Sequence, residues 1–447
     1  MNLSYLVGVL AAVVGLALSI GLHEVGHMLP AKRFGVKVTQ WMIGFGPTLW
    51  SRRGPETEYG VKAIPLGGYI RMIGMYPPPV PRAADHHPGR FEALSDEAKV
   101  QAWQEVGPGE AGRTFYRLSV PRKVVVMLGG PTMNLLIAVV MFTVLLVGIG
   151  LPTATTTLSR VAGCLPASMT SEQAAQAALA AGTLGTEPCG TGSEPSPAHV
   201  AGLVAGDAIV SVNGTEVSQW EGLTQATRSN PGGTVVLGVA DASGTLRTVT
   251  VVLGTAYRPA FDAEGRPTGG VEATGYLGVT PQSQYVTQSL SAVPGQMWQV
   301  AVMSGKALLT LPARVADLAT GMLNGQARDP NSPVSVVGIG RISGEVAATQ
   351  NPLTAKLAVW VSLMASLNLF LFLFNLLPIL PLDGGHVAGA LWEGLRRRIA
   401  LVRGRPDPGP VDVSRALPVA YGMAVLLIAL STVVILADVV NPISLTG

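Results

Sequence analysis

Charged residues are scarce in this chain of 447 residues. Asp, Glu, Lys and Arg make up 13% of the sequence and hydrophobic residues 48%, whereas an ordinary soluble domain carries about twice that charged fraction. The scarcity excludes a disordered chain, a coiled coil and a purely cytosolic protein. The formal net charge of +3 is too small to indicate nucleic-acid binding, so nucleic acid is not expected among the partners.

Four stretches lack Asp, Glu, Lys, Arg and His altogether, and each is long enough to cross the roughly 30 Å apolar layer of a bilayer. They are residues 1–22, 124–159, 357–382 and 416–437. The first has no basic residue before it, whereas a cleaved signal peptide needs a basic start and a small-residue cleavage site. We therefore interpret it as a retained span and expect a multi-pass protein of the cell membrane.

Basic residues near the ends of these stretches predict which side each loop occupies, because positive charge favours the cytoplasmic side. The basic residues concerned are Lys32, Arg33, Lys37, Arg122, Lys123 and Arg396 to Arg398. They predict that segments 30–122 and 384–415 are cytoplasmic. Residues 155–356 and both termini are then predicted on the outer side.

The outer segment holds both cysteines, Cys164 and Cys189. An oxidising compartment makes a disulfide between them plausible, and two free buried thiols are the alternative. Residues 157–282 contain short β-rich runs, such as 234–239 and 246–253, separated by turn signals. They predict a small β-rich domain.

Residues 294–324 instead repeat apolar side chains at the spacing of one helical face. Charged residues and Pro312 within this segment argue against a fifth span, so we expect it to lie flat on the membrane or against the helical bundle.

The first cytoplasmic segment resembles a run of strands, at residues 36–43, 48–51, 58–64 and 69–73. Several are too apolar for a solvated hairpin, and exposed strand edges cannot face lipid. A sheet at membrane depth must therefore line a protein-walled cavity that water reaches. Residues 84–113, including His86 and His87, look polar and solvated.

The chemistry is predicted at the end of the first stretch, in His23-Glu24-Val25-Gly26-His27. Two histidines four residues apart stand on one face of a helix, where both imidazoles can bind one metal ion. Glu24, beside the first of them, can take the proton of a water molecule in the open coordination position, which is how this arrangement hydrolyses amide bonds. A polar helix end without metal is the alternative, but ionisable groups at the end of a membrane helix are costly and usually functional.

Hydrolytic zinc usually takes three protein ligands and one water molecule, so a third ligand is required. Asp383 ends the third uncharged stretch, and the predicted sidedness brings the carboxyl ends of the first and third spans to the same side. Its carboxylate can thus meet both imidazoles. Pro378 and Pro381 break the helix before it and free backbone groups that the amide of Asn375, water or a bound peptide can satisfy. His386 is a competing third ligand.

These motifs resemble the site-2 protease family of intramembrane zinc metalloproteases, in particular the regulator-of-sigma-E protease type. The resemblance is strongest at 23–27, at 129–134 and at 375–385. It implies His23, His27 and Asp383 as ligands of Zn²⁺, Glu24 as catalytic base, and Asn375 and Pro378 as substrate-contacting residues. Asn134 also matches the family motif, although an amide that packs helices together explains it equally well.

The resemblance further implies that the 36–73 sheet is a membrane-reentrant β element that holds an unwound substrate strand. Residues 201–214 with 275–279 resemble one PDZ module, whereas some relatives carry two. The resemblance implies that this chain is a zinc-dependent intramembrane endopeptidase in the lipid bilayer. Its substrates would be single-span membrane proteins, such as anti-sigma factors and remnant signal peptides, cut after a first extracytoplasmic cleavage.

The fold class expected from all this is a polytopic α-helical membrane protein with four transmembrane helices, a membrane-associated cytoplasmic-side β-sheet and an extracytoplasmic β-rich PDZ domain. The expected segments are 1–29 (first span), 30–83 (β element), 84–121 (cytoplasmic loop), 122–152 (second span), 153–283 (PDZ domain), 284–355 (amphipathic juxtamembrane region), 356–386 (third span), 387–415 (cytoplasmic loop) and 416–438 (fourth span).

Two other functions fit part of the pattern. One is a catalytically inactive PDZ membrane adaptor, against which the intact Glu24 argues, because a scaffold needs no base beside a ligand. The other is a transporter whose broken third span coordinates an ion. That function predicts internal hydropathy symmetry, which the four stretches do not show.

Overall fold

The computed structural model describes residues 2–79, 89–190, 193–261, 267–325, 328 and 332–442. The chain forms two compact units, one of residues 1–149 with 287–447 and the other of residues 150–286. We call them the helical unit and the β-rich unit and describe each by itself. His86 and His87 lie outside the described residues.

Within the described residues, the helical unit has four helices long and apolar enough to cross a membrane. These are α1 (Leu3–Arg33), α3 (Val120–Thr143) with its π-helical continuation η3 (Val144–Ile149), α9 (Leu353–Asn375), and η5 (Val413–Ala416) with α11 (Leu417–Val440). Each begins in or near one of the four uncharged stretches. The third span is shorter than the expected 356–386, because its helix ends at Asn375 and a new helix starts at Asp383.

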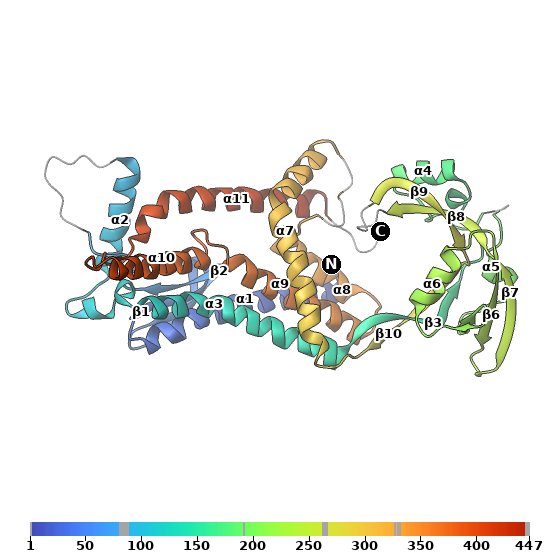
Figure 1. Ribbon diagram of the computed structural model, residues 1–447, viewed down its shortest axis with the longest axis horizontal. Helices are drawn as coiled ribbons and strands as arrows, with labels where there is room; N and C mark the ends of the chain where they lie inside the picture. Colours follow the sequence, from blue (N-terminus) through green and yellow to red (C-terminus); the bar gives the residue numbers. More distant parts are fainter. Residues whose placement is uncertain are drawn as a thin grey trace. The chain divides into compact units, whose positions relative to one another are not determined.

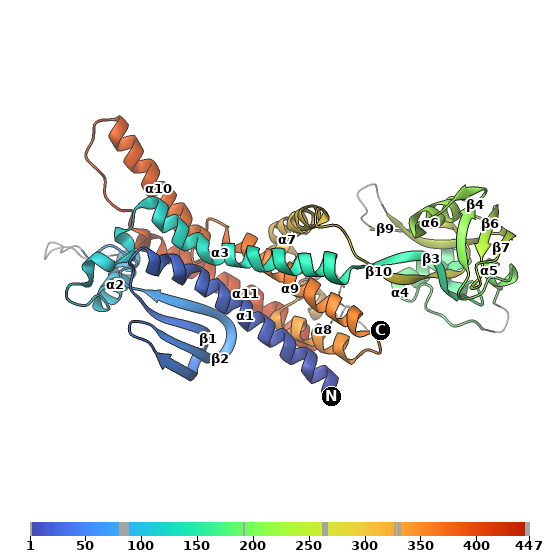
Figure 2. The ribbon, with the colours of Figure 1, turned by 90° about the horizontal axis from the view of Figure 1, so that it is seen from below.

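Helices α1 and α3 lie side by side in both views (Figures 1 and 2). Their backbones touch at two glycines: a Cβ added to Gly26 would lie 2.3 Å from the carbonyl oxygen of Gly129, and one added to Gly129 would lie 2.0 Å from that of Gly26. Small residues allow this close approach of membrane helices. Farther along α1, the hydroxyl of Ser19 donates to the side-chain oxygen of Asn368 on α9.

Strands β1 (Val38–Arg53) and β2 (Glu58–Met72) form a sheet against α1. Residues 40–43 pair with 68–71 on one side and with 58–61 on the other, and residues 50–53 also pair with 58–61. Both strands bend at glycine-containing segments, where Gly44, Gly46 and Gly67 have positive φ. The two long strands therefore contain the four short strand segments that the sequence predicts.

The segment after the sheet is less solvated than expected. It forms α2 (Arg90–Gln104), η1 (Glu110–Arg113) and η2 (Phe115–Arg117). The side chains of Ser95 and Lys99 are buried on α2, where they bond to Ser414 and Asp412 respectively. Helix α2 is polar overall and packs on the start of the fourth span through these two buried polar side chains. Composition alone does not reveal this contact.

The region 284–355 forms two helices, α7 (Ala292–Leu323) and α8 (Val336–Ala348). In Figure 1, α7 runs across α9 and α11 rather than along them, and it contacts both. Its Val315 and Leu318 share a buried cluster with Val434 and Ala437 of α11. Helix α7 is not among the four candidate spans in the described part of the chain.

The segment expected as the loop 387–415 is largely helical, because α10 (Asp383–Val402) runs through its first half. Its packing face contacts α3. The ammonium group of Lys123 on α3 donates to the buried carboxylate of Glu393 on α10 at 2.7 Å. Breaking such a buried pair on one side costs about 3–5 kcal/mol, so this contact holds α10 on α3.

The β-rich unit has one main sheet of strand order β10-β3-β4-β6-β7, with β5 paired to β4, and a separate hairpin of β8 and β9. Its elements are β3 (Leu151–Val161), α4 (Glu172–Ala181), α5 (Pro197–Val200), β4 (Ala208–Val212), β5 (Thr215–Glu216), α6 (Trp220–Arg228), β6 (Thr234–Ala240), β7 (Leu246–Val252), β8 (Gly254–Phe261), β9 (Pro267–Tyr276) and β10 (Val279–Val286), with a short 3₁₀ turn η4 (Ala167–Met169). The runs expected at 234–239 and 246–253 are strands β6 and β7.

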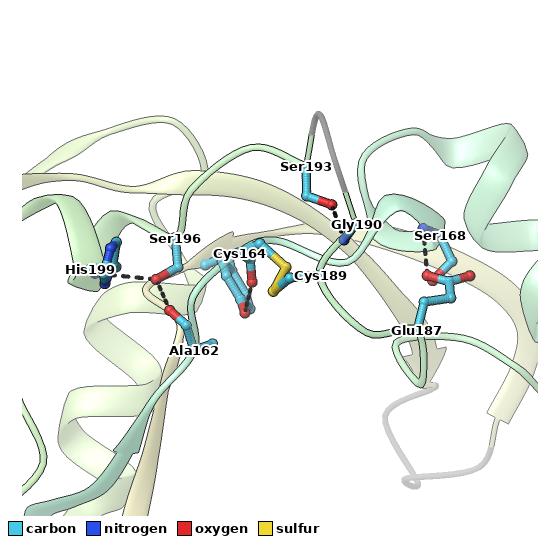
Figure 3. The surroundings of a disulfide bond; sticks show 10 residues. Ala162, Cys164, Ser168, Glu187, Cys189, Gly190, Ser193, Ser196 and His199 are labelled. Carbon is cyan, nitrogen blue, oxygen red and sulfur yellow. Dashed lines mark hydrogen bonds between the residues drawn. A yellow bond between two sulfur atoms is a disulfide. The ribbon is translucent and has the colours of Figure 1, made fainter.

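Cys164 and Cys189 form a disulfide in this unit (Figure 3). The bond closes the loop that carries η4 and α4. Leu165 and Met169 of this loop form a small buried cluster with Ala256 of β8 and Tyr276 of β9. The disulfide that the sequence made plausible is therefore present, and it holds this loop beside the β8–β9 hairpin.

Candidate metal centre

His23 and His27 lie one turn apart on the same face of α1, as their spacing predicts. Their ring centroids are 4.8 Å apart, and the Nε2 atoms are 3.2 Å apart. His27 is buried and His23 partly buried. Both Nε2 atoms therefore point to the same place.

Asp383 completes this group from the other end of the chain. Its Oδ2 lies 3.3 Å from Nε2 of His23 and 3.4 Å from Nε2 of His27. In the described part of the chain, these three residues are the cluster of His, Cys, Asp or Glu side chains that could hold a metal ion. The structure thus brings together all three residues expected as ligands.

The loop 376–382 and two glycines set the position of Asp383. A Cβ on Gly384 would lie 2.2 Å from the carbonyl oxygen of Leu377, and one on Gly385 would lie 2.6 Å from the backbone nitrogen of Leu380. Only glycine allows the first turn of α10 to pack so closely on this loop. The Asp-Gly-Gly sequence is therefore what lets the carboxylate reach α1.

The donor set and its spacing fit zinc. Two imidazoles and one carboxylate are typical zinc ligands, and at metal–ligand distances of about 2.0–2.1 Å the atoms of a tetrahedral site lie about 3.3–3.4 Å apart. The three separations of 3.2, 3.3 and 3.4 Å match this value. Three protein ligands also leave the fourth position of a hydrolytic site open.

Helix α3 supplies the surroundings of the two imidazoles. Nδ1 of His27 lies 2.8 Å from the carbonyl oxygen of Val126, which fixes Nδ1 as the protonated nitrogen and leaves Nε2 free for a metal. Gly130 faces both rings: a Cβ there would lie 2.2 Å from Nε2 of His27 and 2.7 Å from Nε2 of His23. The missing side chain of Gly130 is what makes room for the site.

Asn134, one turn farther along α3, contacts Nδ1 of His23 at 3.1 Å through its side-chain amide and is 1% exposed. Its Oδ1 has no hydrogen-bond partner. With the amide turned end for end, Oδ1 accepts a hydrogen bond from an Nδ1–H of His23 and is satisfied. Asn134 then orients His23 as Val126 orients His27.

Glu24, on α1, faces the sheet and is 8% exposed. A Cβ on Gly68 of β2 would lie 3.0 Å from Cγ of Glu24, and the backbone amide of Ile70 faces its carboxylate. The absence of a side chain at Gly68 therefore lets the sheet edge reach the candidate base.

Asn375 and Pro378 precede Asp383 in the chain, at the end of α9 and in the loop after it. Asn375 is the last residue of α9, is partly exposed, and makes no side-chain hydrogen bond to another described residue. Pro378 is exposed in the loop that follows. His386, three residues after Asp383, is not part of the three-residue cluster, so the geometry favours Asp383 over His386 as third ligand.

Two features of the centre cannot be read from the sequence. The contacts of Gly130 and of the Val126 carbonyl with the histidines depend on how α3 packs on α1, although the Gly-Gly-Pro sequence is a signal of close backbone approach. The contact of Asn134 with His23 favours a positioning role over simple helix packing.

Comparison with known proteins agrees with this geometry. A model described as peptidase family M50 matches residues 11–405. The chain is 33% identical over 456 residues to the zinc metalloprotease Rip1 of Mycobacterium tuberculosis, covering 99% of each chain. It is 26% identical to a putative zinc metalloprotease of Clostridium acetobutylicum, covering 98% of each. Identity to the regulator of sigma-E protease RseP of Escherichia coli is 24%, over 86% of this chain and 90% of that one.

Proposed function

Because the chain belongs to peptidase family M50, the site-2 protease family of zinc metalloproteases, we propose that it cleaves the transmembrane segments of single-span proteins within the membrane. The observation that supports this most directly is the convergence of His23, His27 and Asp383 on one point beside Glu24, at the end of an apolar helix. The catalytic and ligand roles of these residues are part of the proposal.

The proposed reaction is hydrolysis of a peptide bond. His23, His27 and Asp383 would hold the zinc ion, which when bound would supply Lewis acidity toward the scissile carbonyl and toward a water molecule. Glu24 accepts the proton of the attacking water and later delivers it to the leaving amine nitrogen. The low exposure of Glu24 keeps bulk water away from the proton that it carries.

A substrate helix hides every peptide carbonyl in its own hydrogen bonds, so it must unwind before it can be cut. We infer that the edge of β2 around Gly68 and Ile70 replaces those bonds by adding the substrate as a further strand. Large apolar side chains of the sheet, such as Phe45, Leu49 and Trp50, are 46%, 70% and 59% exposed. Their exposure supports an apolar setting for this sheet.

Asn375 and Pro378 would contact the unwound strand from the side opposite the sheet. The free amide of Asn375 can bond to a peptide group that the substrate has lost from its helix. Pro378 holds the loop open, since proline cannot continue a helix and offers no donor of its own.

The finer assignments extend this proposal. We infer that the β-rich unit is a PDZ domain on the extracytoplasmic side, and that the centre lies near the cytoplasmic side, as the basic residues indicate. A bulky outer domain admits substrates already trimmed by a first cut. The name of the Escherichia coli relative, regulator of sigma-E protease, supports anti-sigma factors as substrates, with remnant signal peptides as a second class.

Replacing Glu24 by glutamine tests the proposal. Purified Glu24→Gln protein should bind zinc like the wild type and fail to cut a membrane-spanning reporter, with a loss of about 10²–10⁴-fold for removal of a general base. Glu97→Gln, an exposed residue of α2, removes the same charge elsewhere and should cut normally.

The same experiment separates the alternatives. Unchanged cleavage by Glu24→Gln would contradict the mechanism. No cleavage by the wild type, together with unchanged binding of membrane proteins by Glu24→Gln, would favour the inactive adaptor.

A further inference from the structure

Helix α10 has a packed face and an exposed face. On the packed side, Ala390, Glu393 and Ala400 are buried, and a Cβ on Gly394 would lie 3.2 Å from Val120 at the start of α3. In Figure 2 the end of α10 projects away from α1, α3 and α11. The other side of its second half is therefore without a partner among the described residues.

The exposed face is apolar. Leu391, Leu395 and Val402 are 57%, 50% and 86% exposed, and they are joined by Trp392 and Ile399 at 53% and 40%. At 3.6 residues per turn these five side chains fall within about 100° of one another. They form a continuous stripe, which we call the α10 stripe, opposite the packed face.

Arginines flank the α10 stripe on both borders. By the same helical geometry Arg398 lies about 20° beyond one edge, and Arg396 and Arg403 lie about 20–40° beyond the other. None of the three forms an ion pair with a described residue, whereas Arg397, on the packed side, pairs with Glu393 and Asp407. The three flanking charges are thus available for an external anion.

We propose that this face of α10 is a docking surface for anionic phospholipid. An apolar stripe bordered by arginines is the pattern of a helix that lies in the membrane interface. The apolar side chains enter the boundary of the acyl chains, and the long arginine stems carry their guanidinium groups to the headgroup phosphates. Helix α10 follows the candidate span α9 in the chain and packs on the candidate span α3, so a bilayer is the partner already beside it.

A soluble protein partner fits these observations less well. A protein-binding helix face carries its charges toward complementary residues of one partner, whereas here arginines border the stripe on both sides. Positive charge on both borders matches a surface that continues on both sides of the helix, as a layer of headgroups does.

Quenching of Trp392 in proteoliposomes tests the proposal. The full-length protein is reconstituted with lipids brominated near the carbonyl end of the acyl chain, on either phosphatidylglycerol or phosphatidylcholine, at equal fractions. The Trp392→Phe protein supplies the contribution of the other tryptophans. Brominated phosphatidylglycerol should quench Trp392 at several-fold lower fractions than brominated phosphatidylcholine, and 0.5 M salt should reduce this preference.

The triple variant Arg396→Gln, Arg398→Gln, Arg403→Gln should lose the preference. Each arginine near an anionic surface contributes a factor of up to about five, so removing all three should abolish the several-fold preference and make the two lipids quench alike. Arg397→Gln removes a like charge from the packed face and should keep most of it.

Three outcomes would overturn the proposal. They are equal quenching by both lipids at low salt, no quenching by either lipid, and a triple variant that retains the preference. The salt dependence of the wild type decides the matter even where a variant fails to fold.

Discussion

Replacing Gly130 by alanine would place a methyl group inside the candidate metal centre. The added Cβ would lie 2.2 Å from Nε2 of His27 and 2.7 Å from Nε2 of His23, while ordinary contact begins at 3.4 Å. The two nitrogens would have to retreat by about 1.2 Å and 0.7 Å, the differences between these values. Metal–ligand distances vary by only about 0.2 Å, so the two imidazoles could not keep their common focus.

We expect Gly130→Ala to bind zinc at least about 100-fold more weakly, a loss of about 2.8 kcal/mol. Cleavage of a membrane-spanning reporter should fall in parallel at limiting zinc. Elemental analysis and competition with a chelator measure the affinity of detergent-purified protein, and circular dichroism with gel filtration measures whether the helices and the particle size are retained.

Gly148→Ala is the matched control. It adds the same methyl group to the continuation of the same span, where a Cβ meets nothing within 4 Å, and it should bind zinc like the wild type. The reasoning is refuted if Gly130→Ala keeps wild-type zinc affinity, because the imidazoles would then not face Gly130 as described.

Three further changes have defined outcomes. Asn134→Ala should weaken zinc binding by about 10–100-fold in the same chelator competition while the helices stay folded, because it removes the group that orients an imidazole. Cys164→Ser with Cys189→Ser opens a loop whose ends are 25 residues apart and should destabilise it by about 3 kcal/mol, seen as faster hydrogen exchange of residues 162–190 in the full chain. Burial raises the pKa of Asp412, but hydrogen bonds from Lys99 and Ser414 outweigh it and hold that pKa below its ordinary value of 3.8. The contact of α2 with η5 should therefore persist at neutral pH and be lost as the pH falls through the lowered pKa. Hydrogen exchange of α2 measures this loss.

The parts of the fold that depend on local pattern could be predicted from the sequence. Uncharged runs give the four candidate spans, because crossing the bilayer is a matter of length and polarity within one segment. The pair His23 and His27 follows from helical spacing in the same way. Counting the membrane crossings between Asp383 and the first span predicts that this residue lies on the same side as the two histidines, and in the structure its carboxylate contacts both.

The parts that depend on distant contacts could not be predicted. Gly26 and Gly129 touch backbone to backbone, and nothing in either neighbourhood names the other as its partner. Helix α8 packs on α1 by the same means: a Cβ on Gly8 would lie 2.2 Å from the carbonyl oxygen of Ser343. Small residues leave no periodic apolar signal, so close packing of this kind is visible only in three dimensions.

The backbone contact between Gly26 and Gly129 has a consequence for how a peptide chain enters. With no side chain between them, the two backbones are in direct contact, so admitting a peptide between these spans would break close packing that no side chain can replace. A polypeptide substrate should therefore not reach the candidate metal centre by passing between α1 and α3. We expect the peptide chain to enter instead beside Gly68 of β2 and the exposed Pro378.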